Sequence, residues 1–380
     1  MLLGVGAIGT VIAKHLAGHR AIESLTLSDM DTTRAEKLAR ELDGSNIKVE
    51  RLDAADPDAL ARSLKGYGLI VNAVLPRFNG AIMDAALAAG SHYMDLAGGE
   101  EDQFLRDPAW KKAGLVALHG MGEDPGISNV LARWAVDRLD EVDAIRVRDG
   151  EFSESDEFPL ACLFSNETFI EEAVSEATYF ENGETKNLPA WSNREVYRFP
   201  DPVGPQPIYN MSHEEVQTLP RFIGKGLKFV DFKLAVPDTM QKQLSFLDSI
   251  GMTRMDTVRV RGGEVTPLAV LSAVLPQPAD LGGKIQGAGI ILVEVDGRSK
   301  GKSTRHILYS VITHDEAFKR LKVTATAFLT GSGGAAGALA IASGKVKQTG
   351  VVSPEHLDAE PILGLLEELG LKVSKEEKAL

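Results

Sequence analysis

After three residues the chain reads Gly4-Val5-Gly6-Ala7-Ile8-Gly9, which matches the pattern GxGxxG. In a turn that joins a strand to a helix, Gly4 permits the tight turn, Gly6 lets the backbone approach a pyrophosphate, and Gly9 lets the helix pack closely on the strand. The free amides and the positive dipole end at the start of that helix favour a phosphate group. The stretch therefore predicts a parallel α/β sheet that binds a dinucleotide at its first turn, through Gly4, Gly6, Ala7, Ile8 and Gly9.

An acidic residue follows at the spacing typical of this fold. Asp29 lies 20 residues after Gly9, at the end of the next predicted strand, where a carboxylate accepts hydrogen bonds from the adenosine ribose. A carboxylate there repels a 2′-phosphate, so the sequence favours NAD over NADP, although Arg34 leaves NADP open. The alternative is a glycine turn without a nucleotide, which the context of strand, turn and helix disfavours.

Short apolar strands alternate with helices over the first third of the chain, which indicates βαβ units. The predicted strands are 25–27, 47–52, 69–74, 92–96 and 115–118. Asp56 before Pro57 predicts a helix start, and Gly90 predicts a helix end. Because three residues precede Gly4, where a core strand has ~5–6, we expect a short first strand and a natural chain that begins upstream. The pattern predicts a Rossmann-type doubly wound parallel sheet.

The pattern changes after about residue 127, where the strands become longer and alternate more clearly. Further strands are predicted at 144–148, 227–235, 256–260, 290–295 and 305–311. They indicate a second α+β domain with a mostly antiparallel sheet. The segment 199–220 carries five prolines and predicts a long functional loop.

Composition excludes several classes of protein. The chain has 380 residues and 41 Lys plus Arg against 54 Asp plus Glu, a formal net charge of −13, and it lacks a basic run, so neither nucleic acid nor an anionic membrane is an expected partner. Its single cysteine, Cys162, excludes an intrachain disulfide and suits a core position in a cytoplasmic protein. Apolar stretches such as 268–275 fall short of the ~18 residues that span a bilayer, and no signal segment is apparent.

Several segments beyond the first turn resemble the saccharopine dehydrogenase-like family, which includes saccharopine reductase, lysine 6-dehydrogenase and carboxynorspermidine dehydrogenase. The segments are VNAV at 71–74, YMDLAGG at 93–99, GEDPGISN at 122–129, HEE at 213–215 with TLPR at 218–221, and GKVK at 344–347. The similarity runs nearly from end to end, and lysine 6-dehydrogenase is closest in layout.

The resemblance implies how the domains are divided. Residues 1–126 plus 328–380 would form the dinucleotide-binding domain, and residues 127–327 would form the substrate-binding and dimerisation domain. Gly331 to Gly337 would then be a close helix contact, because no nucleotide-binding pattern with an acidic partner follows it. A homodimer is the expected assembly.

Ligands of a doubly wound sheet lie beyond the carboxyl ends of its strands, which places the next candidates in one crevice. Asn72 and Ala73 would lie along the nicotinamide and its ribose, and Asp53 would bind the adenine edge or cap a helix. Asp95 is a candidate for substrate binding. Asp124 is a candidate catalytic residue, with capping of the helix after Gly126 as the alternative.

Hydride transfer at a C–N bond needs a group that exchanges a proton with the nitrogen and a cation that holds an amino acid carboxylate. We predict His213 for the first role and Arg221 for the second, with a structural ion pair as the alternative for His213. Glu100 would bind a distal ammonium or be a surface acid. His119 is expected to be a buried structural histidine.

The sequence thus predicts an NAD(P)-dependent oxidoreductase that acts on the C–N bond of a small amino acid, most simply lysine or saccharopine. A carboxylated polyamine is the alternative substrate, and a non-catalytic dinucleotide-binding module is the alternative class. No metal is expected, since the sequence holds neither an HExxH nor an EF-hand pattern.

Overall fold

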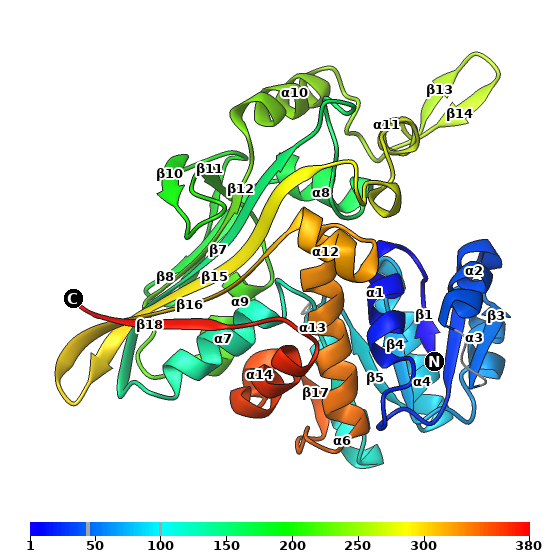
Figure 1. Cartoon of the computed structure of the whole chain (residues 1–380), viewed down its shortest axis with the longest axis horizontal. Helices are drawn as coiled ribbons and strands as arrows, with labels where there is room; N and C mark the ends of the chain where they lie inside the picture. The colour runs from blue at the N-terminus through cyan, green and yellow to red at the C-terminus, as the bar shows by residue number, and fades with distance from the viewer. Residues whose placement is uncertain (43–45, 99–100) are drawn as a thin grey trace.

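The computed structural model describes residues 1–42, 46–98 and 101–380, which form two domains side by side (Figure 1). The first is built on a parallel seven-stranded sheet in the order β17-β6-β5-β4-β1-β2-β3. Its strands are β1 (Leu2–Leu3), β2 (Leu25–Asp29), β3 (Ile47–Arg51), β4 (Leu69–Asn72), β5 (His92–Asp95), β6 (Val116–Leu118) and β17 (Gly350–Val352). This confirms the doubly wound parallel sheet with its short first strand.

Helices cover both faces of this sheet because its strands are apolar on both sides. One face packs against α1 (Ala7–Leu16), α2 (Thr32–Leu42), α13 (Ala325–Ala342) and α14 (Ala359–Glu368), and the other against α3 (Pro57–Ser63), α4 (Asn79–Ala89) and α6 (Asp107–Ala113). The predicted helix ends are confirmed. The Asp56 carboxylate accepts hydrogen bonds from the amides of Asp58 and Ala59, and Gly90 ends α4 at φ 74°.

The second domain contains a mixed sheet in the order β10-β11-β12-β7-β15-β16-β18, with β8 and β9 branching from β12. Its pairs are antiparallel except for β12 with β7, which confirms the mostly antiparallel sheet. Its strands are β7 (Glu141–Glu154), β8 (Ala177–Glu181), β9 (Glu184–Leu188), β10 (Glu195–Arg198), β11 (Pro205–Asn210), β12 (Phe229–Ala235), β15 (Gln286–Ser299), β16 (Lys302–Thr313) and β18 (Ser374–Ala379).

Helices pack around this sheet and join it to the first domain. They are α7 (Ile127–Val136), α8 (Asn166–Val174), α9 (Glu215–Ile223), α10 (Asp238–Ser249), α11 (Pro267–Val274) and α12 (His314–Leu321), whereas the short helix α5 (Glu101–Phe104) belongs to the first domain. Short 3₁₀ turns are η1 (Pro76–Phe78), η2 (Pro278–Asp280) and η3 (Pro354–His356).

Two sequence predictions in the second domain are wrong. The segment 199–220 is not a loop, because it contains β11 and the start of α9, whose Val216, Leu219 and Ile223 are buried. Pairing with β10 and β12 on its two sides outweighs the weak local signal of a proline-rich strand. The strand predicted at 256–260 does not join the large sheet, because β13 (Val258–Val260) pairs only with β14 (Gly263–Val265) in a separate hairpin.

The carboxyl-terminal part of the chain contributes to both domains. Helix α13 lies against α1, and β17 extends the parallel sheet, whereas β18, red in Figure 1, pairs with β16 of the second sheet. The expected division placed all of 328–380 in the first domain. The last strand, β18, instead joins the second domain, because the edge of β16 offers unpaired backbone groups along its length.

The glycines of α13 bring helices and turns into close contact. A Cβ atom at Gly333 would lie 1.9 Å from the carbonyl oxygen of Gly122, and one at Gly331 would lie 2.4 Å from the Cβ of Val11. This confirms a packing role for the second glycine-rich segment. Among the described residues α13 is also the one helix that is long and apolar enough to cross a membrane, and most of it is buried inside the molecule.

Candidate active site between the domains

A cavity of about 670 Å³ lies between the two domains, at the carboxyl ends of the parallel strands β1 to β5 and against β7 and β12. Helices α8 and α13 close its sides. The predicted site residues that line it are Gly4, Gly6, Ile8, Asp29, Asp53, Ala73, Asp95, Asp124 and His213. Ala7, Gly9 and Asn72 lie behind this lining, Arg221 lies apart from it, and Glu100 falls outside the described residues.

The half of the cavity next to α1 has the shape of a dinucleotide site. Gly4 has φ +88°, and a Cβ atom at Gly9 would lie 2.0 Å from the Gly4 carbonyl oxygen, so both glycines serve the turn itself. A Cβ atom at Gly6 would meet no protein atom within 4 Å, and no side chain caps the start of α1. The turn therefore leaves open space and free amides where a pyrophosphate would bind.

Two carboxylates stand at the outer end of this half. Asp29 accepts hydrogen bonds through Oδ2 from the Val5 amide at 2.8 Å and through Oδ1 from the Asp31 amide at 3.2 Å. Asp53 accepts one from the Ala55 amide at 2.9 Å. Asp56 is the residue that caps α3, so Asp53 is free of the capping role and lines the cavity.

The side chains of Asp95 and Asn72 form buried hydrogen bonds beneath the cavity. The Asp95 carboxylate accepts from the Gly120 amide at 2.7 Å and from the Tyr93 hydroxyl at 3.0 Å, and it lies 3.1 Å from Nδ1 of His119. Asn72 donates to Asn79 and to Tyr93. Asp95 thus has its oxygens engaged by the protein, and His119 is a buried structural residue as expected.

The other half of the cavity is acidic. Asp124 and Glu123 come from the turn before α7, and Asp149 comes from β7. Burial raises the pKa of Asp124 well above its usual range, as do the charges of Asp149 and Glu123 and a hydrogen bond between the Asp124 and Asp149 carboxyls. Asp124 does not cap α7, because Gly126 is the first flanking residue and donates its amide to Asn129. Burial and the repulsion between the two carboxyls therefore favour a proton shared by Asp124 and Asp149.

The pKa of Asp149 is raised as well. Burial raises its pKa to about 7, while the hydrogen bond from Asp124 and the charge of His213 oppose the rise. Glu151 lies two residues farther along β7, on the same face of the strand, where burial and the charge of Asp149 raise its pKa to about 8. Thr326 of α13 donates a hydrogen bond to Glu151 at 2.7 Å.

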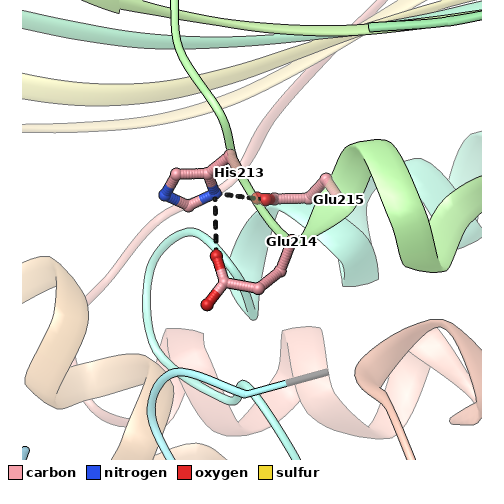
Figure 2. A group of neighbouring side chains, drawn as sticks. All are labelled: His213, Glu214 and Glu215. Carbon is pink, nitrogen blue, oxygen red and sulfur yellow. Dashed lines mark hydrogen bonds and ion pairs between the residues drawn. The ribbon is translucent and has the colours of Figure 1, made fainter. Parts of the chain in front are cut away.

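His213 faces this acidic half just before α9, and Figure 2 shows it with two neighbouring glutamates. Its Nδ1 lies 2.5 Å from Oε2 of Glu215 and 3.5 Å from Oε2 of Glu214, and its ring stacks on Phe232 at a centroid distance of 3.9 Å. Burial opposes the charge on the ring, but Glu215 and Glu214 outweigh burial and raise the pKa of His213 to about 10. Within the described residues its Nε2 takes part in no hydrogen bond.

These three side chains also place possible ligand atoms within 4.8 Å of one another. A metal would have to displace the proton that Glu215 stabilises on His213, since a histidine ligand is neutral. The ion pair accounts for the cluster without a metal. Ser128 donates a hydrogen bond to Glu215 at 2.6 Å and fixes its carboxylate from the side of α7.

Arg221 does not reach the cavity. It lies on the exposed face of α9, where it pairs with Glu101 at 2.7 Å and lies 4.5 Å above the ring of Phe104. The sequence placed it in a functional loop, whereas the helix turns its side chain outward. Cys162 is buried, as expected, and burial raises the pKa of its thiol to about 12.

Four residues of the acidic half are absent from the predicted site residues. They are Glu123, Asp149, Glu172 and Glu214, which line the cavity from the turn before α7, from β7, from α8 and from the segment before α9. The signal was present for Asp149: an acidic residue in the middle of an apolar strand marks a buried charge that needs a partner. The predicted strand ended at residue 148 and so excluded it, whereas β7 continues to Glu154.

Comparison with known families matches the two domains separately. Residues 1–118 match the saccharopine dehydrogenase NADP binding domain, and residues 122–371 match the saccharopine dehydrogenase C-terminal domain. The chain belongs to the saccharopine dehydrogenase family. Oxidoreductase chemistry with a nicotinamide dinucleotide therefore belongs to the chain by descent, as the first turn predicted.

The names of two relatives of this chain refer to carboxylated polyamines or their derivatives. A carboxyaminopropylagmatine dehydrogenase of Synechocystis sp. is 29% identical over 386 residues, which covers 98% of this chain and 96% of that protein. A carboxynorspermidine synthase of Vibrio alginolyticus is 28% identical over 395 residues, which covers 97% of this chain and 94% of that protein. These names match the alternative substrate class of the sequence analysis better than lysine or saccharopine.

Solved structures of the saccharopine dehydrogenase family and its neighbours share the fold. Apo saccharopine dehydrogenase (L-Glu forming) from Saccharomyces cerevisiae superposes with a TM-score of 0.74 at 16% identity, covering 100% of this chain and 99% of that one. Homospermidine synthase from Legionella pneumophila, in complex with NAD, gives 0.71 at 15% identity, with 99% and 90% covered. At this identity the likeness extends to the fold alone.

Proposed function

We propose that the protein is an NAD-dependent oxidoreductase that acts on a C–N bond of a carboxylated polyamine. The observation that carries the proposal is the charge of the cavity beyond the dinucleotide half. Among the described residues there, carboxyl side chains outnumber cations: Glu123, Asp124, Asp149, Glu172 and Glu214 line it, against Arg77 and His213. A substrate with several ammonium groups and one carboxylate matches this balance.

Saccharopine matches it less well. Saccharopine carries three carboxylates, which would face five carboxyl side chains in a buried cavity. Burying like charges together costs free energy that a single arginine does not offset. The names of the relatives from Synechocystis and Vibrio support the polyamine class independently of the charge argument.

The dinucleotide half supports NAD as the cofactor. The free amides at Gly6 and the start of α1 would hold the pyrophosphate, and Asp29 would accept hydrogen bonds from the ribose hydroxyls. When bound, the nicotinamide accepts or donates the hydride at the substrate carbon. A 2′-phosphate would meet the charge of Asp29, and Arg34 is directed toward Asp280, at 3.4 Å, rather than toward Asp29.

Asp149 would exchange the proton at the substrate nitrogen. In the oxidative direction the carbon loses a hydride and the amine nitrogen loses a proton, which leaves an imine that water converts to a carbonyl and a free amine. A base with a pKa near the working pH is suited to this exchange, and the pKa of Asp149 lies at about 7. The protonated Asp124 beside it would orient the carboxylate through their shared hydrogen bond.

His213 would stay protonated throughout. Its pKa of about 10 keeps the charge at neutral pH, and Glu215 holds Nδ1, so Nε2–H remains available as a hydrogen-bond donor in the cavity. We assign it to the oxygen of the attacking water or of the carbonyl at the reacting carbon. This role differs from that of a proton acceptor, because a histidine already protonated cannot take a second proton.

The test is a set of initial rates, read from the absorbance of the reduced nicotinamide. Purified protein is offered NAD or NADP with carboxylated polyamines of several lengths, lysine and saccharopine. We expect turnover with a carboxylated polyamine and NAD. Higher kcat/KM with lysine or saccharopine contradicts the proposed substrate class, and NAD binding without turnover of any substrate supports the non-catalytic alternative.

Glu172→Gln sharpens the same test. Glu172 lines the cavity and burial raises its pKa to about 8, so binding of an ammonium group would draw it into the ionised form. We expect KM for the polyamine to rise about 10-fold, the scale of one charged hydrogen bond. Glu171→Gln is the matched control, since Glu171 lies on the same helix but is exposed.

A further inference from the structure

We propose that Arg77 binds the carboxylate of the substrate and thereby sets which end of the molecule enters the cavity first. This inference rests on the proposed function. Arg77 lies in η1, directly after the strand that ends at Asn72, and lines the cavity. It is the only arginine or lysine among the described residues of that lining.

The side chain of Arg77 has free hydrogen-bonding capacity. Its Nη1 lies 3.8 Å from Oε2 of Glu167, which is beyond hydrogen-bond distance, and within the described residues it makes no hydrogen bond. The guanidinium lies 5.0 Å from the ring centre of Phe78, which limits where it can swing. A carboxylate in the cavity can therefore take two parallel N–H donors from Arg77 without breaking a hydrogen bond, although it would compete with the long ion pair to Glu167.

The opposite wall offers further donors to the same anion. Ser165 and Thr168 line the cavity at the start of α8, a nine-residue helix whose amino end carries a partial positive charge. Glu167 of that same turn lies 3.8 Å from Arg77 across the two domains. A carboxylate between Arg77 and α8 would be held from both domains.

The other two candidate cations, His213 and Arg221, do not take this role. Glu215 and Glu214 neutralise His213, and Arg221 points away from the cavity toward Glu101. The two ends of the cavity thus differ in charge. Arg77 lies at the η1 side, and the carboxyl groups lie at the β7 side. A substrate with its carboxylate at Arg77 would direct its amine groups toward Asp149 and Glu172, which fixes the end that reacts.

The experiment compares Arg77→Met and Arg77→Lys with the wild-type protein. We expect Arg77→Met to raise KM for the carboxylated polyamine 10- to 100-fold with a smaller change in kcat, the effect of losing a bidentate charged pair. Arg77→Lys should fall between, since a lysine keeps the charge but not the planar pair of donors. Arg254→Met is the control, because Arg254, like Arg77, is more than half exposed, is paired with Asp256, and lies outside the cavity.

Two binding measurements decide what Arg77 recognises. The dissociation constant of NADH should change less than 2-fold in Arg77→Met. Calorimetry with the cofactor present should show that the wild-type protein prefers the carboxylated polyamine to its decarboxylated analogue and that Arg77→Met loses this preference. An NADH constant that rises as much as KM would assign Arg77 to the cofactor phosphates and overturn the inference, as would an unchanged preference.

The outcomes separate this inference from the proposed function. If the wild-type protein turns over the carboxylated polyamine and Arg77→Met has the wild-type KM, only the assignment of Arg77 fails. If the wild-type protein turns over lysine or saccharopine instead, the proposed substrate class fails. In that case the calorimetric comparison of each carboxylate substrate with its decarboxylated analogue still tests Arg77.

Discussion

The two halves of the cavity recognise ligands by different means. The half beside α1 uses backbone: a glycine that leaves open space at Gly6 and uncapped amides at the start of a helix. The half beside β7 uses side chains, namely carboxyl groups that are buried against one another around Asp149. Backbone recognition requires specific residue types at fixed spacing, whereas side-chain recognition requires only that distant segments meet.

The difference also affects stability. The glycines at the first turn allow the local backbone geometry and, once the turn has formed, do not raise the free energy of the folded state. Buried carboxyls disfavour the folded state at neutral pH until a proton or a cationic ligand compensates them. The acidic half is thus the part of the molecule where ligand binding and folding stability are most strongly linked.

The largest expected effect comes from Asp149. Asp149→Asn keeps the size of the side chain and removes the base, so we expect kcat to fall about 10²- to 10⁴-fold. The wild-type oxidative rate should fall as the pH drops below about 7, because the base must be unprotonated, and the variant should lose this dependence. Stopped-flow or steady-state rates between pH 5 and 9 give both quantities.

Asp143→Asn is the control for that prediction. Asp143 lies on the same strand, is partly exposed, and pairs with Lys228 outside the cavity. Its rates should equal those of the wild-type protein. If Asp149→Asn keeps a wild-type kcat with the same pH profile, the proton exchange belongs to another group and the acidic half serves binding alone.

The second prediction separates open from packed glycines within one turn. Gly6→Ala places a methyl group in empty space, so we expect an unchanged melting temperature and a dissociation constant for NAD that rises about 10²-fold. Gly9→Ala places it 2.0 Å from the Gly4 carbonyl oxygen and should destabilise the fold by about 1–3 kcal/mol. Thermal melts and NAD titrations of both variants are the measurement. Equal loss of melting temperature in both would show that Gly6 serves packing.

The same contrast explains what the sequence could predict. The first turn, Asp29 and the strands β1 to β6 follow from local spacing, whereas β17, which joins the sheet from far along the chain, was not predicted. In the second domain the sheet was recognised from β7, β12, β15 and β16, but β8 to β11 and β18 were not predicted. In β11 the prolines hide the strand pattern. Predicting the fold therefore succeeded where neighbours in sequence decide the structure.

The candidate site divides in the same way. His213 and Asp124 were selected from motifs and do line the cavity, but their catalytic roles stay predictions. Arg221 was selected because a proline-rich segment predicted a loop, and one helix turn directs it away. Asp149 and Arg77 come together only when β7 of the second domain faces η1 of the first, which no local pattern encodes.

A third prediction concerns a buried acid outside the cavity. Glu355 is fully buried, accepts a hydrogen bond from Asn129 at 3.1 Å, and has its pKa raised to about 7 by burial. Since its unfolded pKa is 4.5, the folded state binds the extra proton between about pH 4.5 and 7. Its contribution to stability is therefore lost as the pH rises through that window.

Glu355→Gln removes this titration. We expect the free energy of unfolding of the wild-type protein to fall more between pH 5 and pH 8 than that of the variant, by at most about 3 kcal/mol. Urea unfolding at the two pH values measures the difference. An equal pH dependence in both proteins would contradict the prediction, because it would show that Glu355 is ionised in the folded state.

The smallest expected effect tests where the acidic half ends. Arg221→Ala removes an exposed ion pair with Glu101 and a stacking contact with Phe104, so the free energy of unfolding should fall by less than about 1 kcal/mol. Because its side chain points away from the cavity, kcat/KM for the polyamine should stay within 2-fold of the wild-type value. Initial rates and urea unfolding on the same preparation measure both. A 10-fold rise in KM would place the substrate carboxylate on α9, move the cationic end of the cavity away from Arg77, and show that the two halves do not account for the whole binding site.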